Sequence, residues 1–239
     1  MSDHALPTAH TVKSFDEDIA QLRGIITRMG GLCELQITAA VEALTQRNVD
    51  AAQQVIADDA RIDVLEAEAE ALAVRIIALR APLADDLREI VAALKIAGVL
   101  ERVGDYAKNI AKRASALAQV QPIAPAVIVP EMARTVAEMI RDALDAFVDR
   151  DPELALAVCE RDHHVDEFYN SLFRSLLTFM MENPHHITPS THLLFVAKNL
   201  ERMGDHATSV AEMVYFAVTG QRITDRTKTD NTSSIADPS

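Results

Sequence analysis

One eight-residue pattern occurs twice in this chain of 239 residues. Leu-Glu-Arg-x-Gly-Asp-x-Ala spans residues 100–107 and returns at residues 200–207. The surrounding segments also align, with nine of twenty residues identical between 94–113 and 194–213. Because a long internal repeat indicates a duplicated structural unit, the chain is predicted to consist of two similar halves.

Each half is predicted to form three long helices. In the first of them, apolar side chains recur every three or four residues: Ile19, Leu22, Ile26, Met29, Cys33, Ile37, Val41 and Leu44. This is the spacing of one helix face, and no strand pattern of period two is found. The predicted helices span about residues 14–47, 50–80, 83–117, 131–148 and 151–181, and a sixth ends near residue 220. Local start and stop signals support these bounds: Ser14 with Glu17, Asp151 before Pro152, Pro82, and Gly220.

The predicted fold class is all-α, with two tandem, similar antiparallel three-helix bundles. Hydrophobic residues make up 49% of the chain but aromatic residues only 4%, so small aliphatic side chains fill the core. The predicted organisation is a disordered tail (1–12), a first repeat (13–120), a linker containing Pro122, Pro125 and Pro130 (121–130), a second repeat (131–220) and a disordered tail (221–239).

Charge and composition argue against several classes of protein. A net charge of −13 disfavours binding to nucleic acid, because basic side chains must neutralise the phosphates. We expect no signal peptide, because the N-terminal segment has no apolar core, and no transmembrane segment, because no run of 18 apolar residues occurs. Cys33 and Cys159 stand alone in apolar surroundings, which predicts two reduced core thiols in a cytosolic protein.

Each half also contains two pairs of acidic residues spaced four apart, which places each pair on one helix face. The pairs are Asp59/Asp63 and Glu101/Asp105 in the first half, and Asp162/Asp166 and Glu201/Asp205 in the second. Antiparallel helices could bring the four carboxylates of one half together. Such a site would select hard cations: Mg²⁺, Mn²⁺, Ca²⁺ or ferric iron. Asn109 follows Asp105 by four residues and so extends the face of Glu101 and Asp105 by another turn. Its counterpart in the second half is Ser209, which predicts a second site with fewer ligands.

The competing interpretation is a solvated, salt-bridged helix face, since Lys108 follows Asp105 by three residues. The glycine inside both copies weighs against it. Gly104 and Gly204 lie in the middle of predicted helices, where glycine costs about 1 kcal/mol relative to alanine. Their repetition predicts close approach of a backbone or a bound group.

The doubled Glu-Arg-x-Gly-Asp motif, on the third helix of each repeat, resembles the PhoU family of phosphate-uptake regulators. The resemblance covers about residues 14–219. LRAPLADDLREIVAALKIAGVLERVGDYAKNIAKRA (79–114) is similar to the family's first repeat, and FVAKNLERMGDHATSVAE (195–212) is similar to its second.

The resemblance implies a non-catalytic, dimeric protein that is cytoplasmic and peripheral to the inner membrane through its partners. It implies negative regulation of the phosphate-starvation response, by coupling the ATPase subunit of a phosphate ABC transporter to a sensor histidine kinase. It also implies bound iron, zinc, manganese or magnesium. By position, the implied ligands are Glu101, Asp105, Asn109, Glu201 and Asp205, with Asp59, Asp63, Asp162 and Asp166 as additions from the facing helices.

Two other functions are considered. A ferritin-like di-metal carboxylate oxidase uses Glu-x-x-His motifs, and Glu160/His163 and Glu182/His185 have that spacing, but Pro184 interrupts the second. Neither Glu-Arg-x-Gly-Asp copy has histidine where the oxidase needs it. The other alternative is a metal-free helical adaptor with the same fold.

Overall fold

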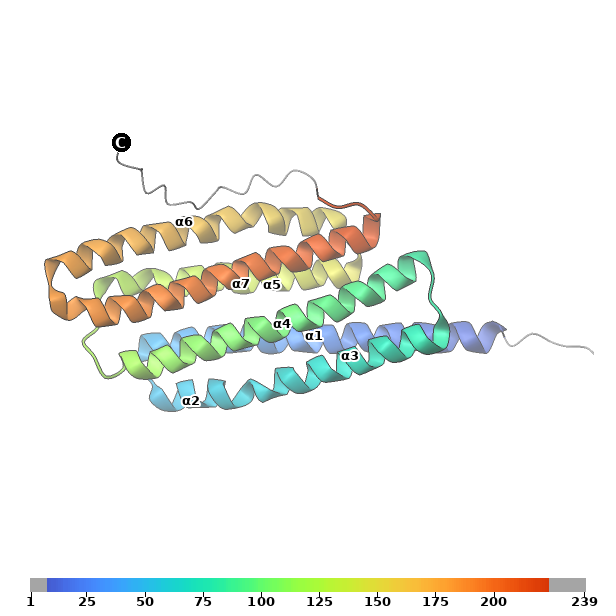
Figure 1. Cartoon of the computed structure of the whole chain (residues 1–239), viewed down its shortest axis with the longest axis horizontal. Helices are drawn as coiled ribbons and strands as arrows, with labels where there is room; N and C mark the ends of the chain where they lie inside the picture. Colours follow the sequence, from blue (N-terminus) through green and yellow to red (C-terminus); the bar gives the residue numbers. More distant parts are fainter. Residues whose placement is uncertain (1–7, 224–239) are drawn as a thin grey trace, which may run out of the picture.

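The computed structural model describes residues 8–223, and all regular structure in that range is helical. The helices are α1 (Thr8–Gln46), α2 (Val49–Asp58), α3 (Ala60–Arg80), α4 (Ala84–Leu117), η1 (Ala124–Ile128), α5 (Val129–Asp149), α6 (Pro152–Glu182), η2 (Pro184–His186) and α7 (Ile187–Thr219). Figure 1 shows that α1, α2–α3 and α4 form one antiparallel bundle and that α5, α6 and α7 form the other. The predicted all-α fold of two three-helix bundles is confirmed.

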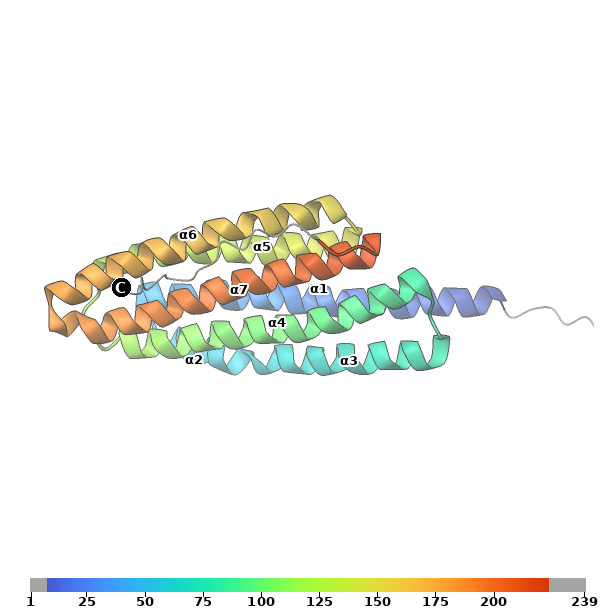
Figure 2. The ribbon, with the colours of Figure 1, turned by 45° about the horizontal axis from the view of Figure 1, so that its top comes forward.

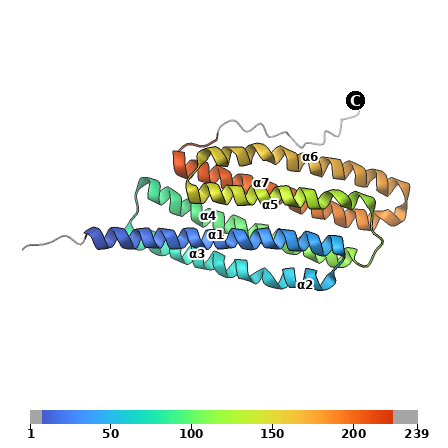
Figure 3. The same ribbon diagram turned by 180° about the vertical axis from the view of Figure 1, so that it is seen from behind.

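The two bundles lie side by side along their length. Helix α4 packs against α7 (Figures 1 and 2), and α1 packs against α5 on the opposite side (Figure 3). The buried side chains of both bundles form one continuous hydrophobic cluster. Gly30 allows α1 and α5 to meet, because a Cβ atom at this position would collide with the side chain of Leu144. The repeats therefore share a core instead of standing as separate domains.

The junction between the first and second helices is the same in both bundles. Arg47 follows α1 and Arg150 follows α5, with left-handed φ angles of 57° and 56°. The next residues, Asn48 and Asp151, are N-caps whose side chains accept hydrogen bonds from the backbone of the following helix. Both pairs are 103 residues apart, so this offset relates α1–α3 to α5–α6. The predicted helix start at Asp151 is confirmed.

Several helix bounds differ from the sequence prediction. Helix α1 begins at Thr8, so residues 8–12 are helical where a tail was predicted. The predicted start signal of Ser14 with Glu17 is therefore wrong, because both residues lie within the helix. The predicted helix 50–80 begins one residue earlier and is divided at Asp59, between α2 and α3. Pro189 lies in the first turn of α7, where its missing N–H is tolerated, instead of in a loop. The remaining predicted tail segments, 1–7 and 224–239, lie outside the described residues.

The other stop signals act as expected. Gly220 caps α7 with a φ of 72°, and its N–H donates to the carbonyl of Phe216. Cys33 is buried and Cys159 is partly buried. Between residues 8 and 223, no helix has a continuous apolar stretch long enough to cross a membrane.

Candidate cation site on the repeated helices

Gly104 lies at a close contact between α4 and the residues packed against it. A Cβ atom at Gly104 would lie 2.8 Å from Cδ1 of Ile62, 3.2 Å from Oδ1 of Asp59 and 3.6 Å from Oε1 of Gln36. Any larger residue would push these groups apart. The glycine therefore lets a buried carboxylate and a buried amide reach the middle of α4.

Gly204 has the same role in the second bundle. A Cβ atom there would lie 3.2 Å from Cγ1 of Val165 and 3.3 Å from Oδ1 of Asp162. Asp162 thus occupies the place that Asp59 has in the first bundle. Both glycines are sites of close approach, but the approaching groups are facing side chains of the same repeat and not the backbone or bound group that the sequence predicted.

A lysine neutralises the buried carboxylate of the first bundle. Only 3% of Asp59 is exposed, and its Oδ2 accepts a hydrogen bond of 2.5 Å from Nζ of Lys108. Lys108 also contacts Oδ1 of Asp105 at 3.3 Å, and the bond to Asp59 raises the pKa of the lysine. One ammonium group therefore links α4 to the junction of α2 and α3.

Glu101 lies in a more negative part of the same cluster. Burial raises the pKa of Glu101, and the nearby charges of Asp105, Asp63 and Glu66 raise it further. Asp63 is exposed, whereas Glu101 and Asp105 are partly buried. The structure therefore brings the two predicted acid pairs of the first half together, from α4 and from the α2–α3 segment. Asn109, one turn further along α4, is also partly buried.

The second bundle holds its carboxylates differently. Only 7% of Glu201 is exposed, and its Oε1 accepts a 2.7 Å hydrogen bond from Nζ of Lys198. Its Oε2 is buried and has no hydrogen-bond partner among the residues that the structure describes. Asp205 is exposed, and Asp162 and Asp166 are partly buried.

Ser209 and Asn109 occupy matching positions in the two bundles. The hydroxyl of Ser209 donates to the backbone carbonyl of Asp205 at 2.9 Å, so it is engaged within its own helix. Asn109 offers an amide oxygen at its position. That the first half is the better cation site stays a prediction.

Within residues 8–223, no three His, Cys, Asp or Glu side chains are already arranged as a metal site. Lys108 and Lys198 supply the positive charge next to the carboxylates. The assignment of these acids as metal ligands therefore stays a prediction. The structure adds Gln36, which the sequence analysis did not select. It lies three residues after Cys33 on the core-facing side of α1, and this polar residue in an apolar stripe was the available signal.

The two motif copies also meet across the bundle interface. Tyr106 and His206 occupy matching positions, and their rings stack with centroids 5.6 Å apart. Burial lowers the pKa of His206; Arg102 and Arg202 lower it further, against the opposite effect of Asp205. The imidazole is therefore neutral at pH 7 and packs as an aromatic ring.

Comparisons with known proteins agree with this architecture. The PhoU domain matches residues 26–114 and 129–214, one match for each bundle. A phosphate-specific transport system accessory protein PhoU homolog from Zymomonas mobilis is 55% identical over 92% of both chains. Another PhoU homolog, from Caulobacter vibrioides, is 49% identical over 91% of this chain and 95% of its own. The crystal structure of PhoU from Pseudomonas aeruginosa superposes with a TM-score of 0.83 at 38% identity, covering 87% of this chain and all of that one. The chain therefore belongs to the PhoU family.

Proposed function

We propose that this protein regulates phosphate uptake as the accessory protein of a phosphate-specific transport system. The observation that carries the proposal is the 55% identity, over 92% of both chains, to a relative with that name. The shared core of the two bundles makes a rigid helical body, which suits a protein that acts through contacts with other proteins. The proposed role is regulatory and not enzymatic.

In its finer form, the protein is a negative regulator of the phosphate-starvation response. It couples the ATPase subunit of the phosphate ABC transporter to the sensor histidine kinase and keeps the kinase output low when phosphate is plentiful. It acts in the cytoplasm, at the inner membrane through these partners, as a homodimer. These steps follow from the family resemblance and are proposals for this chain.

We further propose that the acidic helix faces bind metal ions. Two features support this: the raised pKa of Glu101 among like charges, and the buried Oε2 of Glu201, which has no hydrogen-bond partner among the described residues. Iron, zinc, manganese or magnesium would supply more positive charge than one lysine and would hold the helices of each bundle together. The proposed ligands are Glu101, Asp105, Asn109, Asp59 and Asp63, and Glu201, Asp205, Asp162 and Asp166.

A metal-free adaptor is the second candidate, and one observation favours it. Lys108 and Lys198 already form ion pairs with Asp59 and Glu201, so both buried carboxylates have a protein cation beside them. The di-metal oxidase gains no such support. His163 is exposed, and its ring contacts the backbone carbonyl of Glu160 in its own helix instead of turning toward an acid cluster.

The regulatory role is tested in the source bacterium by deleting the gene. Expression of a phosphate-starvation reporter and the rate of ³²P-phosphate uptake are measured in phosphate-rich medium. We expect both to rise in the deletion strain and to return to normal when the wild-type chain is restored. A deletion strain with unchanged reporter and unchanged uptake would contradict the proposal.

A further inference from the structure

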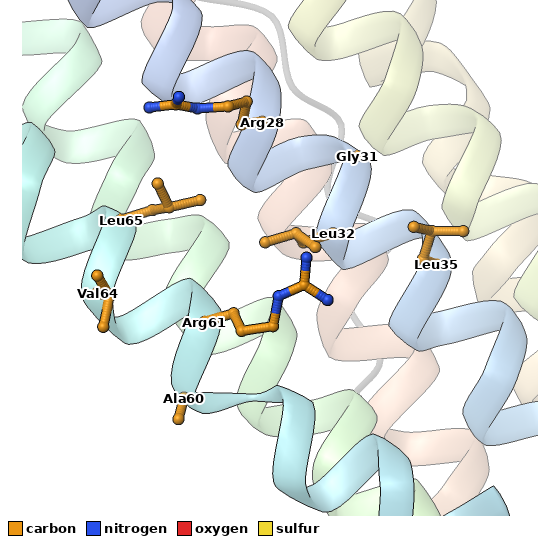
Figure 4. A pocket seen from close by; sticks show the side chains of 8 residues that line it. All are labelled: Arg28, Gly31, Leu32, Leu35, Ala60, Arg61, Val64 and Leu65. Atoms are coloured by element: carbon orange, nitrogen blue, oxygen red, sulfur yellow. The ribbon is translucent and has the colours of Figure 1, made fainter.

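An apolar groove runs along the outside of the first bundle, between α1 and α3. It has a volume of about 640 Å³, and its lining residues are Arg28, Gly31, Leu32, Leu35, Ala60, Arg61, Val64 and Leu65 (Figure 4). Leu35 is 67% exposed and Val64 is 58% exposed. Large apolar side chains exposed along one groove are typical of interaction sites.

The second bundle has a groove at the equivalent place, between α5 and α6, with a volume of about 510 Å³. Six of the eight residues that line the first groove have a counterpart in the lining of the second, each 103 residues later. This is the offset that relates the helix junctions and the positions of Asp59 and Asp162. The six pairs are Arg28/Glu131, Leu32/Thr135, Leu35/Glu138, Arg61/His164, Val64/Glu167 and Leu65/Phe168.

The two grooves share a backbone but differ in chemistry. Glu138 and Glu167 replace the exposed Leu35 and Val64, so the fold does not require apolar side chains at these positions. Exposed leucine and valine gain nothing from burial in the free protein, because the hydrophobic effect needs removal from water. Their presence in one repeat alone indicates that another molecule covers them.

The arginines at this groove define the charge of that molecule. Arg61 extends from α3 toward Leu32 of α1 and has no ion pair within residues 8–223 (Figure 4). Arg28 has one, a 3.8 Å contact with Glu68 in which both side chains are more than half exposed. Such surface pairs contribute little, about 0–1 kcal/mol. Two available guanidinium groups in a chain of net charge −13 favour an acidic ligand.

We propose that the α1–α3 groove docks an amphipathic helix of a partner protein, with leucine-like side chains over Leu35 and Val64 and carboxylates against Arg28 and Arg61. Helix-in-groove recognition uses this combination of apolar anchors and charged rim contacts. A second copy of the chain fits less well. The equivalent groove of a second copy offers carboxylates, but its apolar members Ile128 and Phe168 are partly buried. The inference rests on the proposed function, since the partner is one of the two membrane complexes named there.

The test measures binding of the full chain to the intact phosphate transporter and to the full-length sensor kinase, each in nanodiscs. The variant Leu35→Glu with Val64→Glu gives the first groove, at these two positions, the side chains that the second groove has. Because the second bundle accommodates them, we expect the variant to fold, and a thermal melt checks this. We expect at least about tenfold weaker binding to one complex, which corresponds to about 1.4 kcal/mol.

Charge is tested separately with Arg28→Glu and Arg61→Glu, which we expect to weaken the same interaction. The matched control is Glu138→Gln with Glu167→Gln in the second groove, for which we expect binding within about twofold of wild type, since a rim change outside an interface has little effect. If wild type binds a complex and the folded groove variants bind it equally well, the docking surface is wrong and the proposed function stands. If wild type binds neither complex, the proposed function fails and the docking inference fails with it.

A photo-crosslinker at position 35 identifies the occupant. Crosslinks to an acidic amphipathic helix of the transporter or kinase support the proposal, and a crosslinker at position 138 controls for nonspecific capture. Crosslinks from position 35 to a second copy, or to the terminal segments of the same chain, would overturn it.

Discussion

Lys108 donates a hydrogen bond of 2.5 Å to Asp59, a carboxylate of which only 3% is exposed, directly beside Gly104. This pair connects α4 to the break between α2 and α3. Removing one partner of a buried pair is costly, because the other charge stays in a poorly solvated place.

We expect Lys108→Met to lower the free energy of unfolding by about 1–3 kcal/mol, less than for a fully buried pair because Lys108 keeps contact with solvent. Urea denaturation at pH 7 with a chelator measures the change. Lys112→Met is the matched control, since Lys112 is exposed on the same helix. Equal stability of the two variants would show that the ion pair contributes nothing. Recovery of Lys108→Met by millimolar Mg²⁺ or Mn²⁺ would show that a metal ion can replace the ammonium.

Glu101→Gln is expected to stabilise the protein at neutral pH. The pKa of Glu101 is raised by burial and by neighbouring carboxylates, so the folded state binds its proton more tightly than the unfolded state does. Its ionisation therefore costs stability as the pH rises from the unfolded value, about 4.3, through the raised pKa. Removing the charge should gain about 0.5 kcal/mol at pH 7, by analogy with like-charge helix pairs, and nothing at pH 3.

Unfolding of both proteins at pH 3 and pH 7 without metal measures this effect. A pH-independent difference would assign it to packing instead of charge. The same substitution separates the effect of charge on stability from metal binding. If Glu101 is a metal ligand, Glu101→Gln is more stable than wild type without metal, but adding metal stabilises it less than it stabilises wild type. Equal gains in wild type and variant would remove Glu101 from the ligand set.

Glycine substitutions test the close approach of the helices. Gly24 and Gly104 both lie within helices, but a Cβ atom at Gly24 would meet nothing within 4 Å, whereas one at Gly104 would lie 2.8 Å from Ile62. Gly24→Ala should stabilise by up to about 1 kcal/mol through helix propensity. The free energy of unfolding of Gly104→Ala should be about 1–3 kcal/mol lower than that of Gly24→Ala, because overpacking against Ile62 offsets the gain in helix propensity. Equal melting temperatures for the two variants would mean that α3 moves away without cost.

Several features that depend on local sequence were predictable, but the start signal of Ser14 with Glu17 was wrong, since α1 begins at Thr8. Asp151 and Gly220 cap their helices as expected because capping involves only residues within one turn. The glycine inside both motif copies also predicted a close approach at Gly104 and Gly204, although the groups that approach are side chains. The sequence listed Asp59/Asp63 and Asp162/Asp166 as equivalent acid pairs, and the structure places Asp59 beside Gly104 and Asp162 beside Gly204.

Features that depend on tertiary contacts were not predictable. The division of the second helix at Asp59 coincides with the contact between that residue and α4, which no periodicity encodes. The burial of Gln36 beside Gly104 depends on how α1 packs against α4. The exposure of Leu35 could not be predicted either, because the sequence alone does not show whether an apolar residue within a helix has neighbours that bury it.

The metal content of the protein is expected to be unequal between its halves. Asn109 can add an amide oxygen to the acids of the first bundle, whereas the hydroxyl of Ser209 donates to the backbone carbonyl of Asp205. Purified without chelator or His tag and measured by plasma mass spectrometry, Glu101→Ala with Asp105→Ala should lose more metal than Glu201→Ala with Asp205→Ala. The quadruple variant should lose all of it. If wild type contains no metal and the quadruple variant folds normally, the acids serve as charged contacts of a metal-free adaptor. The ion pairs of Lys108 and Lys198 then supply the positive charge beside Asp59 and Glu201.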